Sequence, residues 1–76
     1  MREAEAKKML KDLKKKFPQL AKPILLDAKT LDRDGFVLKY KAQVPMVGMA
    51  LGKMINKENG KTLLAQAWTS VRAGEL

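Results

Sequence analysis

The chain has 76 residues, of which 16 are lysine or arginine and 8 are aspartate or glutamate, and its formal net charge is +8. A chain of this length forms a single domain, residues 1–76, whose small core gives modest stability. Because the sequence contains no cysteine and no histidine, disulfides and the usual Cys/His zinc sites are excluded, and we expect neither a metal nor a cofactor.

The basic residues are concentrated at the start of the chain. Residues 1–22 contain eight basic and three acidic side chains, an excess of +5 out of the total of +8. Thirteen basic residues are lysine and three are arginine; lysine acts as a point charge toward phosphate, whereas arginine is the commoner reader of base edges. The opening residues form no apolar run, and the longest apolar stretch, 44–51, is far shorter than the ~20 residues of a membrane span. We therefore expect a cytoplasmic protein.

The spacing of apolar residues predicts a first helix over residues 3–17. Five apolar side chains recur at intervals of three and four and form one stripe: Ala6, Met9, Leu10, Leu13 and Phe17. With a turn of about 100° per residue, five lysines fall on the opposite side within an arc of ~120°: Lys7, Lys8, Lys11, Lys14 and Lys15. Pro18 ends the predicted helix, and residues 18–23 are predicted to be a connector.

Residues 24–31 and 36–44 are predicted to be two strands of an antiparallel hairpin. In the second segment the even-numbered positions are all apolar or aromatic, which is typical of a half-buried strand. A three-residue loop, Arg33-Asp34-Gly35, aligns the apolar faces of both strands and puts Gly35 at the left-handed position of a bulged turn. The outer face of this hairpin carries three lysines and three apolar residues: Lys29, Lys39, Lys41, Leu25, Leu31 and Val37.

Two helices are predicted after the hairpin. Pro45 suits the first position of a helix that ends at Asn59-Gly60, and a third strand over 44–51 is the competing interpretation. The last helix is predicted to begin at Lys61-Thr62 and to end at Gly74. We expect its Trp68 to pack in the core, with the indole N–H reaching a polar group at the rim. The predicted fold class is therefore α+β, in the order α-β-β-α-α.

Few residues could support catalysis or ligand chemistry. With no histidine or cysteine and a single serine, Ser70, the chain lacks the common nucleophiles and bases, so we expect no enzyme. Asp32-Arg33-Asp34-Gly35 resembles part of a calcium loop, but Lys41 stands where that loop needs its bidentate glutamate. Gly60-Lys61-Thr62 resembles the end of a phosphate-binding loop, but Ile55 replaces the first glycine of that motif.

The charge and the apolar surface predict two different functions. The first is binding to nucleic-acid phosphates with little sequence specificity, through Lys7, Lys8, Lys11, Lys14, Lys15, Lys29, Lys39 and Lys41. The alternative is a protein–protein interaction or assembly module, most simply a homo-oligomer, that uses Leu25, Leu31, Val37, Met46 and Met49. Methionines at helical spacing also fit a core. Adsorption of the first helix to an anionic membrane is a third interpretation, disfavoured because so small a core needs the apolar stripe.

Overall fold

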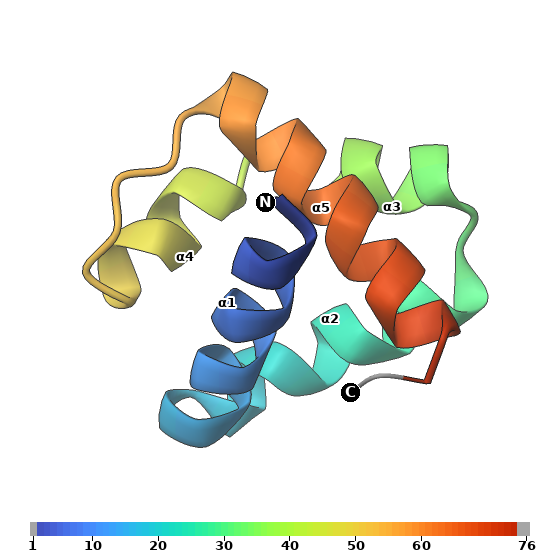
Figure 1. Cartoon of the computed structure of the whole chain (residues 1–76), viewed down its shortest axis with the longest axis horizontal. Coiled ribbons are helices and arrows are strands. Elements are labelled where there is room, and N and C mark those ends of the chain that lie inside the picture. The colour runs from blue at the N-terminus through green and yellow to red at the C-terminus, as the bar shows by residue number, and fades with distance from the viewer. Residues whose placement is uncertain (1, 75–76) are drawn as a thin grey trace.

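Five helices make up the part of the chain that the structure describes, and that part contains no strand (Figure 1). The computed structural model describes the backbone of residues 2–74 and the side chains of residues 4–74. The helices are α1 (Arg2–Lys16), α2 (Pro18–Thr30), α3 (Arg33–Tyr40), α4 (Val44–Ala50) and α5 (Lys57–Arg72). The prediction of an α+β fold in the order α-β-β-α-α is therefore wrong.

The core is built around α5, which packs against each of the other four helices. In Figure 1, α1 begins beside α5 and runs down to the left, α2 lies near the bottom, α4 lies at the left and α3 at the upper right. Every helix contributes to the core, whose buried apolar side chains are Ala6, Met9, Leu10, Leu13, Ala21, Ile24, Ala28, Phe36, Tyr40, Val44, Leu63, Leu64, Ala67 and Val71. A short chain thus buries apolar surface from its whole length in one cluster.

The predicted first helix is confirmed, and so is the orientation of its apolar stripe. The first four stripe residues, Ala6, Met9, Leu10 and Leu13, are buried in the core. Phe17 differs, because the helix ends at Lys16 and Phe17 becomes the partly exposed N-cap residue of α2. The stripe therefore stops one turn earlier than its spacing suggests.

The connector predicted over residues 18–23 is wrong, because these residues form the first half of α2. Pro18 occupies the first turn of this helix, where its missing N–H is not needed. Pro23 lies inside the helix, where a proline typically costs about 3 kcal/mol because it removes one backbone hydrogen bond and crowds the preceding turn. Burial of Ala21, Ile24 and Ala28 against the neighbouring helices offsets that cost.

The predicted hairpin over 24–31 and 36–44 is also wrong, and its two segments lie in α2, in α3 and at the start of α4. The buried residues Phe36, Tyr40 and Val44 are spaced by four, an interval that fits both a strand and one face of a helix. Leu38 distinguishes the two, since a strand would place it with that set, yet it is 65% exposed.

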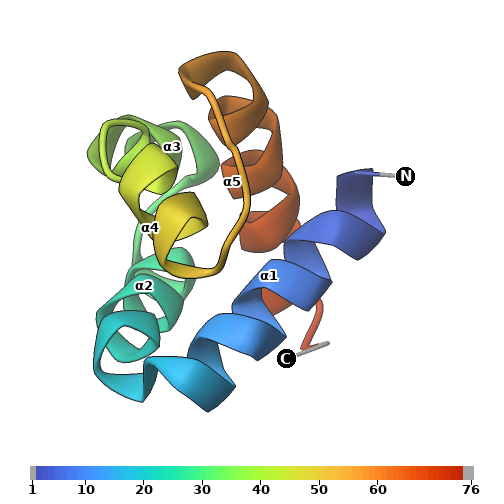
Figure 2. The ribbon, with the colours of Figure 1, turned by 90° about the vertical axis from the view of Figure 1, so that its left-hand side faces the viewer.

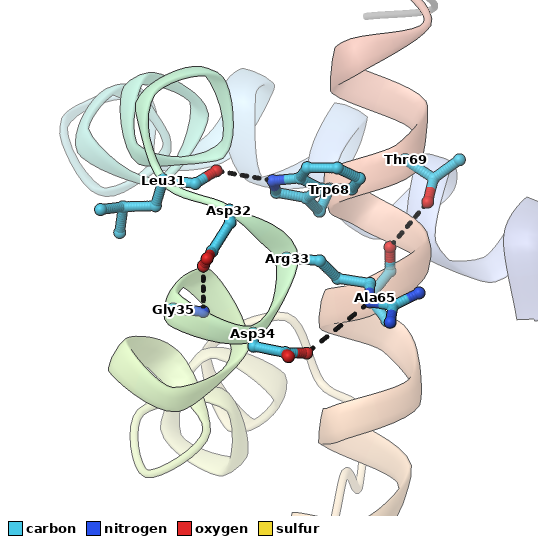
Figure 3. A network of polar contacts seen from close by, with 8 residues as sticks. All are labelled: Leu31, Asp32, Arg33, Asp34, Gly35, Ala65, Trp68 and Thr69. Atoms are coloured by element: carbon cyan, nitrogen blue, oxygen red, sulfur yellow. Dashed lines mark hydrogen bonds and ion pairs between the residues drawn. The ribbon is translucent and has the colours of Figure 1, made fainter.

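The predicted loop of the hairpin is the first turn of α3. Asp32 is the N-cap residue, and its Oδ1 accepts a hydrogen bond from the backbone N–H of Gly35 at an N···O distance of 2.7 Å (Figure 3). An aspartate cap satisfies one of the free N–H groups at a helix start. Asp32 therefore starts a helix at the place where Gly35 suggested a turn.

The remaining boundaries also differ from the prediction. The helix that starts near Pro45 ends at Ala50, well before Asn59-Gly60, and the alternative strand over 44–51 is absent. Gly52 has a φ of +73°, and the N–H groups of Gly52 and Lys53 donate to the carbonyl oxygens of Met49 and Gly48, as in a Schellman motif.

The last helix starts four residues earlier than predicted. Asn56 is its N-cap and accepts a hydrogen bond from the N–H of Asn59 at 2.8 Å. Its C-terminal end follows the prediction, because Gly74 has a φ of +74° directly after the C-cap residue Ala73. Asn59-Gly60 therefore lies inside the first turns of a helix and does not end one.

Two side chains of α5 cover the C-terminus of α2. The indole Nε1 of Trp68 donates to the carbonyl oxygen of Leu31 at 2.8 Å (Figure 3), which agrees with the predicted polar contact of this ring. The Arg72 guanidinium donates to two carbonyl oxygens, from Nε to Ala28 at 2.9 Å and from Nη2 to Leu31 at 2.8 Å. Its Cζ also lies 4.8 Å from the centroid of the Trp68 ring. These contacts satisfy carbonyl groups that a helix end leaves free.

Candidate nucleic-acid interface

The five lysines predicted on the outer side of α1 form the most basic surface of this helix. We call Lys7, Lys8, Lys11, Lys14 and Lys15 the lysine face. Because α1 turns its apolar stripe toward α5 and α2, the opposite side of the helix points away from the core. Four members of the lysine face are exposed, and Lys7 is half-buried.

The exposed members of the lysine face keep their charge uncompensated within the fold. Across residues 4–74, no ion pair joins Lys8, Lys11, Lys14 or Lys15 to a carboxylate. Asp12 is the only acidic residue between positions 6 and 26, and it is half-buried. The lysine face spans nine residues, Lys7 to Lys15, or about 12 Å along the helix, over which one strand of B-DNA presents roughly three or four phosphates.

The other three predicted lysines lie on or directly after two different helices, because the described chain contains no sheet to carry them. Lys29 is exposed in the last turn of α2, and Lys41 is the half-buried C-cap residue of α3. Lys39 forms an ion pair with Asp27 on α2, with an Nζ···Oδ2 distance of 2.7 Å, and its Nζ lies 5.6 Å from the Tyr40 ring centroid. The charge of Lys39 is therefore balanced by the Asp27 carboxylate.

Asp27 joins α2 to α3 through two donors. Its Oδ2 accepts hydrogen bonds from Lys39 Nζ and from the Tyr40 hydroxyl. The bond from Lys39, and then the bond from Tyr40, hold the pKa of Asp27 below its usual value of 3.8. Burial, together with the nearby carboxylate, raises the pKa of Tyr40 to about 12. This cluster is a structural contact between two helices, which sequence spacing alone did not indicate.

The residues predicted to form a protein interface fall into two groups. Leu25, Leu31 and Val37 were assigned to the outer face of a sheet, but their segments are helical in the structure. All three side chains are partly buried and pack against the core. Met46 and Met49 are 68% and 76% exposed on α4. Met54, in the segment between α4 and α5, is fully exposed.

The residues that the structure describes include no cluster of carboxylates suited to a metal ion. No group of three or more Asp or Glu residues in that part of the chain comes close enough to hold a metal ion. Within the same residues, no helix has the length and apolar character that crossing a membrane requires. We found no match between this chain and any protein family, curated protein or solved structure.

Proposed function

We propose that this protein binds nucleic acid through its phosphate backbone, and that the lysine face of α1 makes the contact. The observation that carries the proposal is the orientation of α1, whose apolar stripe is buried while Lys8, Lys11, Lys14 and Lys15 are exposed and unpaired within the described chain. A row of ammonium groups on a rigid helix attracts phosphates and releases the counterions around them.

The residue types of this surface favour contact with phosphates over recognition of bases. Residues 7–15, which carry the lysine face, include no arginine and no aromatic residue. Arginine reads base edges, and aromatic side chains stack on unpaired bases. Trp68 and Tyr40 are engaged elsewhere, by Leu31 and Asp27. Binding should therefore vary little with sequence and depend strongly on salt.

The test is a titration of 20-base-pair DNA and RNA duplexes with the full chain, followed by fluorescence anisotropy at several salt concentrations. Contact with about four phosphates gives a slope of about −3.6 for log K against log salt. On that slope, raising the salt from about 50 to 200 mM weakens binding roughly 100-fold. We expect the triple variant K8Q/K11Q/K15Q to bring the slope close to −1, because about three phosphate contacts are lost.

A matched control keeps the net charge of the triple variant but leaves α1 intact. Lys29, Lys57 and Lys61 are exposed on α2 and α5, so K29Q/K57Q/K61Q removes three charges far from the lysine face in sequence. We expect its salt slope to stay within one unit of the original. Equal losses in the two triple variants, or an affinity that does not change with salt, would refute the proposal.

The proposal includes a cytoplasmic location, where the chain would meet RNA. Fractionation of cells that express the tagged full chain tests this part separately from binding. Recovery of the chain with membranes or in the medium would contradict it without affecting the duplex titration.

A further inference from the structure

The place where α1 meets α2 exposes an aromatic ring among lysines. It lies at the lower edge of the molecule in Figure 2. We define the α1–α2 corner as six exposed residues at the end of α1 and the start of α2: Lys14, Lys15, Lys16, Phe17, Leu20 and Lys22. The first two of these lysines belong to the lysine face, so the corner continues that surface.

Phe17 has the largest exposed fraction of the four aromatic side chains. It is 36% exposed, whereas Phe36 and Tyr40 are buried in the core. Trp68 is half-buried, and the Arg72 guanidinium lies over its ring. A stacked base needs only one accessible face of an aromatic ring, and Phe17 is the side chain of this fold that is placed to offer it.

The backbone fixes Phe17 beside the lysine face. Its N–H donates to the carbonyl oxygen of Leu13 at 2.7 Å, which continues the hydrogen bonding of α1 by one residue. Its carbonyl oxygen accepts from the N–H groups of Leu20 and Ala21, both at 3.0 Å, in the first turn of α2. Residues three apart on a helix are neighbours on its surface, so Phe17 lies next to Lys14. A side chain on a backbone held from both sides loses less freedom when it binds.

The lysines of the α1–α2 corner keep their charge available. From residue 13 to residue 26 the chain has four lysines and no acidic residue. Asp12 is half-buried, and within residues 4–74 no ion pair joins it to a lysine of the corner. Asp27, at the other end of α2, is bonded to Lys39 and Tyr40. The residues of α4 and of its N-terminal side that line a hollow with Leu20 are uncharged. The corner is therefore suited to a polyanion.

We propose that the α1–α2 corner binds an unpaired nucleotide, whose base stacks on Phe17 while its phosphates contact Lys14 and Lys15. This inference rests on the proposed function and names its substrate class, which is single-stranded nucleic acid or a duplex with a single-stranded end. Every base has a flat face, so stacking on one ring tolerates any sequence. An anionic membrane fits less well, because the other apolar residues of the α1 stripe are buried and only Phe17 and Leu20 remain to enter a bilayer.

The test compares three ligands of the full chain by fluorescence anisotropy: a single strand, a blunt duplex, and the same duplex with a single-stranded overhang. Phe17→Leu keeps apolar bulk at the corner and removes the ring. We expect it to weaken binding of the single strand and of the overhang about fivefold or more, which is the effect of losing one base–aromatic stack. Binding of the blunt duplex should change less than about twofold, because its bases are already stacked on each other.

The salt dependence separates the ring from the lysines. Phe17→Leu should leave the slope of log K against log salt unchanged for all three ligands, since no phosphate contact is lost. Phe17→Trp restores a ring and should recover the affinity for the single strand, and the fluorescence of the new indole should be quenched when a base stacks on it.

Leu20→Ala is the matched control. Leu20 is 48% exposed in the same corner and has no ring, so its truncation removes apolar surface without removing a stack. We expect this variant to bind the single strand as the unaltered chain does. Circular dichroism of each variant checks that the helices are retained.

The failure of this inference differs from the failure of the proposed function. If none of the three ligands binds with a salt-dependent affinity, both are refuted. If all three bind with the expected slope but Phe17→Leu binds the single strand as tightly as the unaltered chain, only the stacking inference is refuted. An equal loss on the blunt duplex and the single strand also refutes it. Binding to phosphatidylglycerol vesicles that is lost in both Phe17→Leu and Leu20→Ala, with no preference for the single strand, would identify a membrane as the occupant.

Discussion

Arg72 is the contact through which the last turn of α5 holds the end of α2, so Arg72→Ala is expected to destabilise the whole fold. The substitution removes two hydrogen bonds from a charged donor, to the carbonyl oxygens of Ala28 and Leu31. It also removes the guanidinium that lies over the Trp68 ring. The last carbonyl groups of a helix have no hydrogen-bond partner within that helix. In Arg72→Ala the carbonyl oxygens of Ala28 and Leu31 therefore lose the guanidinium donor, and only Leu31 keeps another bond, from Trp68.

The size of the effect can be estimated from these contacts. A hydrogen bond from a charged group contributes about 1.5–3 kcal/mol when it is shielded from water, and a cation–π contact at an exposed site adds about 0.5–1 kcal/mol. Arg72 is solvent-exposed and Leu31 keeps its bond from Trp68, so we take about 2 kcal/mol for the total loss. In a domain of this size, that corresponds to a decrease in Tm of roughly 10 °C.

Urea unfolding followed by circular dichroism and by fluorescence gives the free energy of unfolding. Trp68 is the only tryptophan, so agreement between the two signals tests whether unfolding is a two-state process. Arg72→Lys keeps the charge but reaches one carbonyl at most, and it should recover less than half of the loss.

Arg33→Ala is the control for the loss of a positive charge. The Arg33 side chain is 62% exposed and forms a 3.8 Å ion pair with Asp34 in the first turn of α3. Exposed ion pairs of this kind contribute between about 0 and 1 kcal/mol. If Arg72→Ala destabilises the chain no more than Arg33→Ala does, the role assigned to Arg72 is refuted.

Three further predictions concern single groups. Tyr40 is the only tyrosine, and its pKa is raised to about 12 in the folded chain. The folded state therefore favours the protonated hydroxyl. The stability that this preference contributes is present below about pH 10 and is lost as the pH rises toward 12. Absorbance at 295 nm should show this late titration in the folded chain, and a midpoint near 10 would contradict the structure. Gly52→Ala should cost about 1 kcal/mol in urea unfolding, since Gly52 has a φ of +73° and the added Cβ meets no atom within 4 Å; Gly52→Asn should cost less. Ser70→Ala should raise Tm by a few degrees, because the fully buried Ser70 hydroxyl finds no hydrogen-bond partner among the described residues. Thr69→Ala, one residue earlier on the exposed side, should not raise Tm because that hydroxyl bonds to the Ala65 carbonyl.

The parts of the fold that could be predicted are those in which one segment carries its own pattern. In α1, apolar residues at intervals of three and four oppose a run of lysines, and no strand register produces that arrangement. The end of α5 was predicted for a similar reason, because Gly74 supplies the left-handed residue that follows many helices. These signals depend only on neighbours within a few residues of each other.

The middle of the chain could not be predicted in this way. The interval of four between Phe36, Tyr40 and Val44 satisfies both a strand and a helix, and only the exposure of Leu38 decides between them. Pro18 and Pro23 indicated a connector, but a proline is acceptable in a first turn, and packing against α1 and α5 supports the rest of α2. Tertiary contacts therefore decide that the middle of the chain is helical, and a local sequence pattern carries no information about those contacts.

The candidate site shows the same division. The exposure of the lysine face follows directly from the burial of the opposite stripe, so the sequence was sufficient to locate it. The engagement of Lys39 by Asp27 depends on how α2 meets α3. Likewise, Leu25, Leu31 and Val37 are covered because two helices stand where a sheet was expected. The exposure of these three apolar residues was therefore predicted wrongly from a wrong element, whereas the exposure of Lys8, Lys11, Lys14 and Lys15 was predicted from a correct helix.

Arginines and lysines occupy different places in this fold, and the difference is consistent with the proposal that α1 contacts phosphates. Both arginines whose side chains the structure describes contact the protein itself, Arg72 at the end of α2 and Arg33 beside Asp34. From Lys8 onward every exposed residue of α1 is a lysine, and lysines offer charge without the planar fork that recognises a base edge. A surface selected only for solubility would gain from interspersed acidic residues, yet between positions 6 and 26 there is one acid, Asp12. The concentration of one sign of charge on a single rigid helix is a cost to the isolated chain through self-repulsion, and binding of a polyanion removes that cost.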